Sequence, residues 1–395
     1  MPGWLEQTSG VLLLALVLLD VFLTVLYARL GTGLLAPRIS QGVWRLFRWA
    51  SRPLGRRRPV AMSFCGPVIL GVLVATWALG LTLGTALVIH PVLGTAVRAN
   101  SGPTPTDFVT AMYVGGNSVS IVGGSNFSPQ TGAFKLFFLF NSLVGLSVVS
   151  LTLTYLMQIY SALQRRNALG LRVYLFSAQR EDAAELIARL GPRGQFQGGY
   201  SNLSELSASV AEMKETHHFY PVLFYFRFPV TFYSVSSVTT VSLDAVSLIR
   251  SALDEREYGW LQESGAVAEL WEASRLAITS LTATFLSEHA ARPGPPSAEA
   301  KERWRRRYRV ALHRLQQAGI RTVADEEAGA RHYVALRAEW DGVVGQLASA
   351  LTYTREEIDP AGTHPERMVK GPPPTRELAR EPFPEGPREG PGPLH

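Results

Sequence analysis

Three long, almost uncharged stretches constrain this chain more than any other feature. Val60 to Ile89 contains no Asp, Glu, Lys or Arg, and neither does Leu136 to Leu163. A helix needs about 20 apolar residues to cross the hydrocarbon core of a bilayer. A further stretch, Val11 to Ala28, is interrupted only by Asp20. We therefore expect three membrane-spanning helices and an all-α membrane protein.

Asp20 is the exception within these stretches, because an intramembrane carboxylate costs on the order of 3 kcal/mol at the bilayer centre. We expect it to pair with Arg45 or Arg48 of the following basic segment. A voltage, proton or gating role is the alternative, although the stretch lacks the regular arginines of a voltage sensor. The preceding residues carry no Lys or Arg, so we do not expect a cleaved signal peptide.

The distribution of charge predicts the orientation. Ala28 to Arg58 carries eight arginines and no acidic residue, whereas Pro91 to Phe134 carries only Arg98 and Asp107. The positive-inside rule places the basic segment in the cytoplasm, so the N-terminus lies outside and the chain from Arg165 onward is cytoplasmic. We expect a multi-pass protein of the cell membrane whose arginines contact membrane lipids. They also account for part of the net charge of +6, and nucleic acid is not an expected partner.

A short apolar segment lies between the second and third stretches. It follows Thr106 and Asp107, either of which can cap a helix, and it includes Thr110 and Tyr113. At about 11 residues it is too short to span a bilayer. Irregular backbone at membrane depth is tolerated only where protein buries it or water lines it. The pattern therefore predicts a re-entrant pore loop.

The order of this short helix, a glycine-containing loop, Pro129 and a spanning helix resembles the pore domain of the bacterial potassium-channel superfamily. The resemblance implies that backbone carbonyls from four loops coordinate a permeant monovalent cation, potassium in the family, and hence a homotetramer. No other cofactor is implied. The pore helix would contain Asp107, Thr110 and Tyr113. The selectivity filter would contain Ser120, Ile121, Val122, Gly123, Gly124, Ser125 and Asn126.

Four filter positions depart from the family's T-V-G-Y-G-D run. Ile121 lacks the threonine hydroxyl that forms the innermost ion site, and Gly124 lacks the aromatic ring that braces the filter. Ser125 replaces a glycine and Asn126 an aspartate. The predicted divergent filter keeps a preference for cations, because the pore helix directs its negative C-terminal end toward the centre, but potassium selectivity does not carry over.

The third stretch supplies two further predictions. By the resemblance, Gly145 is the hinge of the inner helix, with helix packing as the alternative. Asn141, Ser142 and Ser150 form part of a polar face that would line a water-filled cavity, or else make hydrogen bonds between helices.

The whole chain divides into five predicted segments. Helical periodicity after the third stretch indicates a helical domain, and residues 360–395 hold ten prolines and five glycines, which is typical of disorder. Gly170 to Phe176 could be a strand. The segments are 1–31, an N-terminal transmembrane helix; 32–59, a basic interfacial segment with an amphipathic helix; 60–163, the pore domain; 164–355, a cytoplasmic helical domain; and 356–395, a disordered tail.

No enzymatic signature is present. The single cysteine, Cys65, excludes a multi-cysteine metal site, and G-x-S-x-G, Walker A and H-E-x-x-H motifs are absent. We predict no catalytic or metal-binding residues, and we expect His217 and His218 to be ordinary polar residues. The sequence does not identify a cytoplasmic ligand. It favours an ion channel subunit for monovalent cations, and the resemblance implies a potassium channel; the alternative is a non-conducting membrane sensor or scaffold with a degenerate pore loop.

Overall fold

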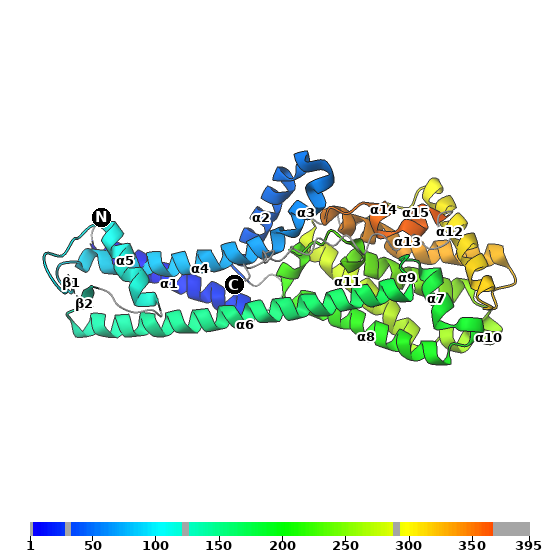
Figure 1. The fold of residues 1–395 in the computed structure, drawn as a ribbon, viewed down its shortest axis with the longest axis horizontal. Coiled ribbons are helices and arrows are strands. Elements are labelled where there is room, and N and C mark those ends of the chain that lie inside the picture. The colour runs from blue at the N-terminus through cyan, green and yellow to red at the C-terminus, as the bar shows by residue number, and fades with distance from the viewer. Residues whose placement is uncertain (1–2, 28–32, 121–125, 287–292, 366–395) are drawn as a thin grey trace, which may run out of the picture.

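The elongated molecule has a small bundle of apolar helices at one end and a larger helical body at the other (Figure 1). The structure is a computed structural model that describes residues 3–27, 33–120, 126–286 and 293–365. Within these ranges the regular structure is helical except for one two-stranded sheet. The predicted all-α class is therefore confirmed for the described residues.

Three helices are long and apolar enough to cross a membrane, as predicted. The first is α1 (Gly3–Val21), which continues as a π-helical turn (Phe22–Leu26). The second is α4 (Cys65–Ile89), and the third is α6 (Gly132–Phe176). The 45 residues of α6 form a helix of roughly 68 Å at 1.5 Å per residue, about twice the thickness of a hydrocarbon core. The same helix therefore connects both ends of the molecule (Figure 1).

Small residues let α1 and α4 approach each other closely. A Cβ added to Gly10 would lie 2.6 Å from the carbonyl oxygen of Gly84, and a Cβ on Gly80 would lie 2.7 Å from a methyl of Val17. Because later α1 residues meet earlier α4 residues, the two helices run antiparallel. The packing follows the small-residue rule of membrane helices, in which van der Waals contact between backbones stabilises association.

Within the described residues Asp20 pairs with no arginine, neither Arg45 nor Arg48, so that prediction is wrong. Its carboxylate accepts hydrogen bonds from the indole nitrogen of Trp77 at 2.8 Å and from the backbone nitrogens of Leu34 and Leu35, both at 2.7 Å. The side chain is fully buried. Neutral donors therefore satisfy the carboxylate where α1, α4 and the start of the basic segment meet.

The basic segment forms α2 (Ala36–Ala50), a 3-10 helix (Arg52–Arg57) and α3 (Arg58–Ser63), which project sideways from the middle of the molecule (Figure 1). Trp44 is buried on α2, with its ring centroid 5.6 Å from that of Tyr225. The side chains of Leu46 and Trp49 are exposed on α2. The predicted amphipathic helix at this position is confirmed.

The helical body is built around α9, whose residues are almost all buried. The predicted helical periodicity after residue 180 is confirmed. Gly170 to Phe176, a possible strand in the sequence, instead forms the end of α6. The helices of the body are α7 (Ala183–Leu190), α8 (Gln197–Phe219), α9 (Val235–Ala252), α10 (Glu255–Gln262), α11 (Gly265–Phe285), α12 (Ala298–Gln317), α13 (Glu326–Ala350), α14 (Arg355–Ile358) and α15 (Pro360–Thr363).

A buried ion-pair network holds this body together. Asp244 on α9 accepts from Arg307 on α12 at 3.1 Å and from Arg337 on α13 at 2.9 Å. Arg307 also pairs with Asp182, and Arg337 with Asp359. Because Asp359 lies between α14 and α15, residues 356–365 belong to the folded body, and the predicted tail boundary at 356 is wrong. The rest of that predicted tail, 366–395, lies outside the described residues.

Candidate functional site

The short segment between the second and third spanning helices forms α5 (Phe108–Val119), and Asp107 caps its N-terminus. The carboxylate accepts from the backbone nitrogen of Thr110 at 2.9 Å and from the Thr110 hydroxyl at 2.7 Å. These hydrogen bonds hold the pKa of Asp107 below its ordinary value, with the hydroxyl bond as the largest cause. Of the two predicted caps, Asp107 is the one observed.

The path of α5 runs back along α4. At its start, the ring of Phe108 makes an edge contact with His90, with centroids 5.5 Å apart, just past the end of α4. Two turns further on, a Cβ added to Gly115 would lie 3.0 Å from the backbone nitrogen of Ala86 and 3.1 Å from the carbonyl oxygen of Thr82. Glycine at 115 therefore permits the close approach of the two helices.

The end of α5 rests against α6. A Cβ on Gly145 would lie 1.8 Å from the carbonyl oxygen of Val119, so no other residue fits there without movement. Four residues earlier on α6, the amide nitrogen of Asn141 donates to the hydroxyl of Ser118 at 3.2 Å. Gly145 stands 13 residues after Gly132, roughly 20 Å along the axis at 1.5 Å per residue.

After α5 the chain returns to the end of the molecule where α5 begins. Ser120 caps α5 with an extended backbone, and β2 (Phe127–Pro129) pairs antiparallel with β1 (Val97–Ala99), which follows α4. The backbone nitrogen of Asn100 donates to the carbonyl oxygen of Asn126 at 2.7 Å. Of the predicted filter, Ser120 and Asn126 are thus placed. Ile121, Val122, Gly123, Gly124 and Ser125 lie outside the described residues.

The remaining predicted site residues are placed as follows. Ser142 and Ser150 on α6 are exposed, as lining residues of an open space would be, but Asn141 is only 2% exposed because it bonds to α5. Tyr113 on α5 is 50% exposed. Gly145 lies inside an uninterrupted helix and serves packing in this structure, and its role as a hinge stays a prediction.

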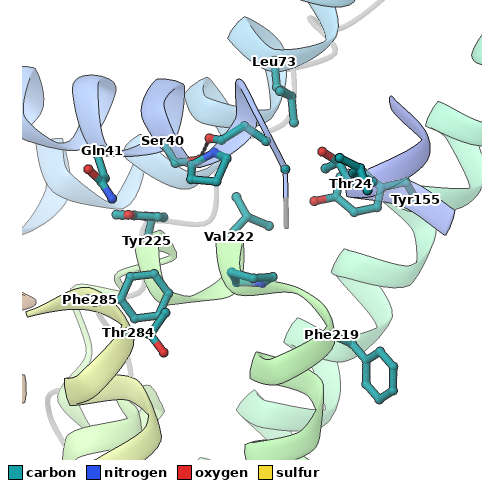
Figure 2. A pocket seen from close by; sticks show the side chains of 15 residues that line it. Thr24, Ser40, Gln41, Leu73, Tyr155, Phe219, Val222, Tyr225, Thr284 and Phe285 are labelled. Carbon is teal, nitrogen blue, oxygen red and sulfur yellow. Dashed lines mark hydrogen bonds between the residues drawn. The ribbon is translucent and has the colours of Figure 1, made fainter. Parts of the chain in front are cut away.

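An apolar cavity of about 140 Å³ lies at the junction between the apolar helices and the helical body. Figure 2 shows Tyr225 and Phe285 on one side, Thr24 and Tyr155 on the other, and Val222 between them. The side chains that surround it are mostly hydrocarbon and aromatic. This cavity suits an apolar group, and the described residues that line it carry no charge with which to bind an ion.

Segment 219–229, which is rich in aromatic residues, supplies part of this junction. Leu223, Phe224 and Phe226 are buried. A Cβ on Gly66 would lie 2.6 Å from the ring of Phe226, so the run packs directly against the start of α4. Core packing is the observed role.

Two buried polar residues at this junction were not identified as functional from the sequence. Arg166 on α6 is 4% exposed and His217 on α8 is 2% exposed. The position of Arg166 directly after an apolar span was a usable signal. Nothing in the sequence around His217 distinguishes it from half-buried His218. Among the described residues, no group of three or more His, Cys, Asp or Glu side chains is arranged to hold a metal ion.

Comparison with known proteins gives one informative similarity. No family model matches the chain, and no solved structure matches it. The chain is 20% identical over 321 residues to the uncharacterized membrane protein YdjJ of Bacillus subtilis (strain 168), an alignment that covers 79% of this chain and 84% of YdjJ. This chain is a helical membrane protein. That conclusion combines the similarity with the three apolar helices that are long enough to span.

Proposed function

We propose that the chain is one subunit of a tetrameric channel for monovalent cations, related to the potassium-channel superfamily. The observation that carries the proposal is the path of α5. It starts beside the end of α4, descends to meet Gly145 of α6, and is followed by β2, which pairs with β1 at the starting end. A re-entrant pore loop has this path.

The dipole of α5 favours a cation at the base of the loop. Its 12 residues lie between two caps, Asp107 at the outer end and Ser120 at the inner end, where the C-terminal carbonyls carry a partial negative charge. The loop that follows would supply carbonyl oxygens as ion ligands. One such loop per chain can form only a quarter of a ring, and a tetramer completes it.

The surface of α6 supports assembly. Only 17% of its most apolar window is buried within the chain. Its buried residues in this window follow one narrow stripe toward α5 and the π-helical turn after α1, and the other faces are left for lipid, for neighbouring subunits and for the pore. Exposed apolar side chains on α6 are Leu136, Leu139, Phe140, Leu143, Leu146, Val149, Leu153 and Met157.

The proposed orientation keeps the sheet of β1 and β2 outside the cell membrane and the helical body in the cytoplasm. The arginines of α2 and the 3-10 helix that follows would then meet anionic headgroups at the inner surface, where each contributes about 1 kcal/mol. Exposed Trp49 at the end of α2 suits the same interface.

The direct test is ion flux into liposomes that contain the purified protein, with potassium, sodium and larger cations compared by reversal potential in planar bilayers. A potassium-biased reversal potential supports a filter that folds as in the family. Equal permeability supports a wider cation pore. Absence of flux under all conditions overturns the channel proposal in favour of a membrane sensor or scaffold.

A matched pair of glycine variants tests the loop geometry. Gly145→Ala places a methyl group against the carbonyl oxygen of Val119, so we expect it to displace α5 and reduce flux at least tenfold. Gly71→Ala is the control, because a Cβ on Gly71 meets nothing within 4 Å. Equal flux in the two variants would contradict the proposed role of the contact between α5 and α6.

The double variant Gly124→Tyr, Ser125→Gly tests the filter assignment. It restores two residues of the family pattern, and we expect the permeability ratio of potassium to sodium to rise. If a conducting protein keeps the same ratio after both changes, these residues do not line the conduction path.

A further inference from the structure

Two buried arginines at the junction bond to backbone carbonyls. Arg166 donates to the carbonyl oxygens of Leu223 at 3.0 Å and Phe226 at 2.9 Å. Arg227 donates to the carbonyl oxygens of Leu351, Pro59, Phe228 and Thr352, at 3.2 to 3.4 Å. Arg166 is only 4% exposed to solvent, and Arg227 only 3%.

Within the described residues, neither arginine forms an ion pair. The carboxylate that acts on Arg227 from a distance, Glu357, bonds to the backbone nitrogen of Thr354 at 2.6 Å. Arg165, the neighbour of Arg166, does have a carboxylate, that of Glu212 at 2.9 Å, but on the surface. Burial of a cation without a counter-ion costs several kcal/mol, so the junction carries an excess of positive charge that attracts an anion.

Arg166 and His217 each have a buried nitrogen with no hydrogen-bond partner among the described residues. In Arg166 it is Nε, since both terminal nitrogens donate to carbonyls, and in His217 it is Nε2, since Nδ1 lies 2.8 Å from the carbonyl oxygen of Met213. Both residues line one enclosed cavity of about 10 Å³. Ser234 and Tyr353 contribute hydroxyl groups to the same lining.

The N-terminus of a long helix adds to the positive potential. Ser234 is the N-cap of the 18-residue helix α9, and Val235 is its first residue; both line the cavity. The first turn of a helix carries a partial positive charge. The orphaned nitrogens of two nearly fully buried side chains provide the independent evidence that this helix end has a ligand.

We propose that this cavity binds a small monovalent anion, a halide, together with a proton on His217. The cavity volume is about that of one water-sized particle, which suits a monatomic anion better than sulfate or an organic anion. The halide accepts from Nε–H of Arg166 and from Nε2–H of His217, and its charge balances the proton on His217. The proposal concerns binding and holds whether or not the protein conducts ions.

The proton follows from the geometry of the imidazole. Nδ1 faces the carbonyl oxygen of Met213, so Nδ1 carries the hydrogen in the neutral ring and Nε2 presents a lone pair to the cavity. A lone pair repels a halide, whereas an Nε2–H attracts it. Burial, and secondarily the charge of Arg166, lowers the pKa of His217 to about 3, so the ring is neutral before the anion enters. Halide and proton therefore enter together.

Few ionisable groups face His217 across the cavity. They are Arg166 from α6, Arg227 from the segment before α9, and Tyr353 after α13. Burial raises the pKa of Tyr353 above its ordinary value, so this phenol is neutral and adds no negative charge; its hydroxyl donates to the carbonyl oxygen of Phe228 at 2.9 Å. The two permanent cations and the helix N-terminus all favour the halide.

The test measures thermal unfolding of the purified full-length protein in detergent, at matched ionic strength, in chloride, bromide, sulfate or gluconate. With halide at ten times its dissociation constant we expect the Tm to rise by about 3–6 °C over gluconate and sulfate. Between pH 7.5 and 5.5 we expect the apparent dissociation constant for chloride to fall about tenfold per pH unit, because each halide brings one proton.

Variants test whether the effect of halide on the Tm arises at this cavity. Arg166→Met removes the Nε donor and should abolish the halide effect, and His217→Gln should keep a weaker effect without the pH dependence. Arg321→Met is the control, since the Arg321 side chain is 79% exposed and pairs with Glu257 on the surface. It should respond to halide as the unchanged protein does.

Crystals of the unchanged protein grown in bromide provide the second measurement, whose result does not depend on whether a variant folds. We expect an anomalous bromine peak between Arg166 and His217. A protein whose Tm is the same in all four salts, or a bromide crystal with a water molecule at this position, overturns the proposal: the cavity is then a site for one structural water.

Discussion

Four arginines are nearly fully buried in the part of the chain that the structure describes, and they form two pairs with different surroundings. Arg307 and Arg337, inside the helical body, face carboxylates from four elements. Arg166 and Arg227, at the junction, face backbone carbonyls. The charges of the first pair are balanced within the chain, and those of the second pair are not.

The difference concerns what each region can do. A buried cation with carboxylate partners is locked, because loss of any partner leaves an uncompensated charge. A buried cation held by carbonyl dipoles is satisfied in hydrogen bonding but not in charge, so its energy depends on what occupies the adjacent space. The body is therefore a fixed frame, and the junction between body and spanning helices is the region that can respond to a ligand.

The largest expected effect comes from a substitution that removes a carboxylate partner of Arg307 and Arg337. Asp244→Ala removes the carboxylate shared by Arg307 and Arg337, and we expect the free energy of unfolding to fall by about 3–5 kcal/mol. Denaturant unfolding followed by tryptophan fluorescence measures the loss. Asp254→Ala is the control: Asp254 caps exposed α10 through the backbone nitrogen of Glu257, and its loss should cost about 1 kcal/mol. Similar losses in the two variants would mean that the network is not the frame of the body.

The next effect is the pH dependence that His217 introduces. Its pKa of about 3 in the folded protein lies below the ordinary value of 6.5, so between these values the unfolded chain binds a proton that the folded chain does not. In halide-free buffer, stability should therefore fall by up to about 1.4 kcal/mol per pH unit as the pH drops below 6.5. His217→Gln should remove this slope, and chloride should reduce it in the unchanged protein. A slope that is identical in both proteins would place the titration elsewhere.

A smaller effect separates the two pairs directly. Arg166→Met in halide-free buffer removes an uncompensated charge but leaves the carbonyls of Leu223 and Phe226 without their donor, and we expect a net loss of only about 1–2 kcal/mol. Arg337→Met, its counterpart in the body, should cost at least twice as much, because Asp359 loses its arginine and Asp244 keeps only Arg307. Equal losses would show that the junction arginines are compensated after all.

Sequence patterns predicted the parts of the fold that depend on local composition. The spanning stretches, the amphipathic α2 and the cap at Asp107 follow from charge spacing and capping preference, and all are present. The partners of Asp20 were predicted incorrectly, since the prediction considered only opposite charges and so favoured an arginine. The actual donors, Trp77 and two backbone nitrogens, become available only when α1 and α4 pack.

In the candidate site, too, features that depend on local composition were predicted and features that depend on packing were not. The position and length of α5 could be read from the sequence, but the burial of Asn141 depends on which face of α6 meets α5. The small cavity that Arg166 and His217 line could not be predicted from the sequence, because the two residues are 51 positions apart and meet only through tertiary packing. Long-range convergence of isolated polar residues has no local pattern.

The smallest expected effect concerns Glu181, which lies in the turn after α6 and bonds to Thr231 and Ser237. Burial raises its pKa from 4.5 to about 7, so the folded protein holds a proton that the unfolded chain releases between these values. Its contribution to stability is complete below pH 4.5 and is lost as the pH rises to 7, opposite in sign to that of His217. Because the side chain is only partly buried, we expect about 0.7 kcal/mol per pH unit, half of the full value.

Glu181→Gln tests this slope because glutamine resembles the protonated acid at every pH. Relative to the unchanged protein, the variant should gain stability steadily from pH 4.5 to 7. In a double variant with His217→Gln, the two opposite slopes should both disappear, whereas each single variant should expose the other residue's slope. A Glu181→Gln protein that keeps the original pH profile would mean that the turn after α6 does not exchange a proton in this range, and His217 would then be the only one of the two that links pH to the junction.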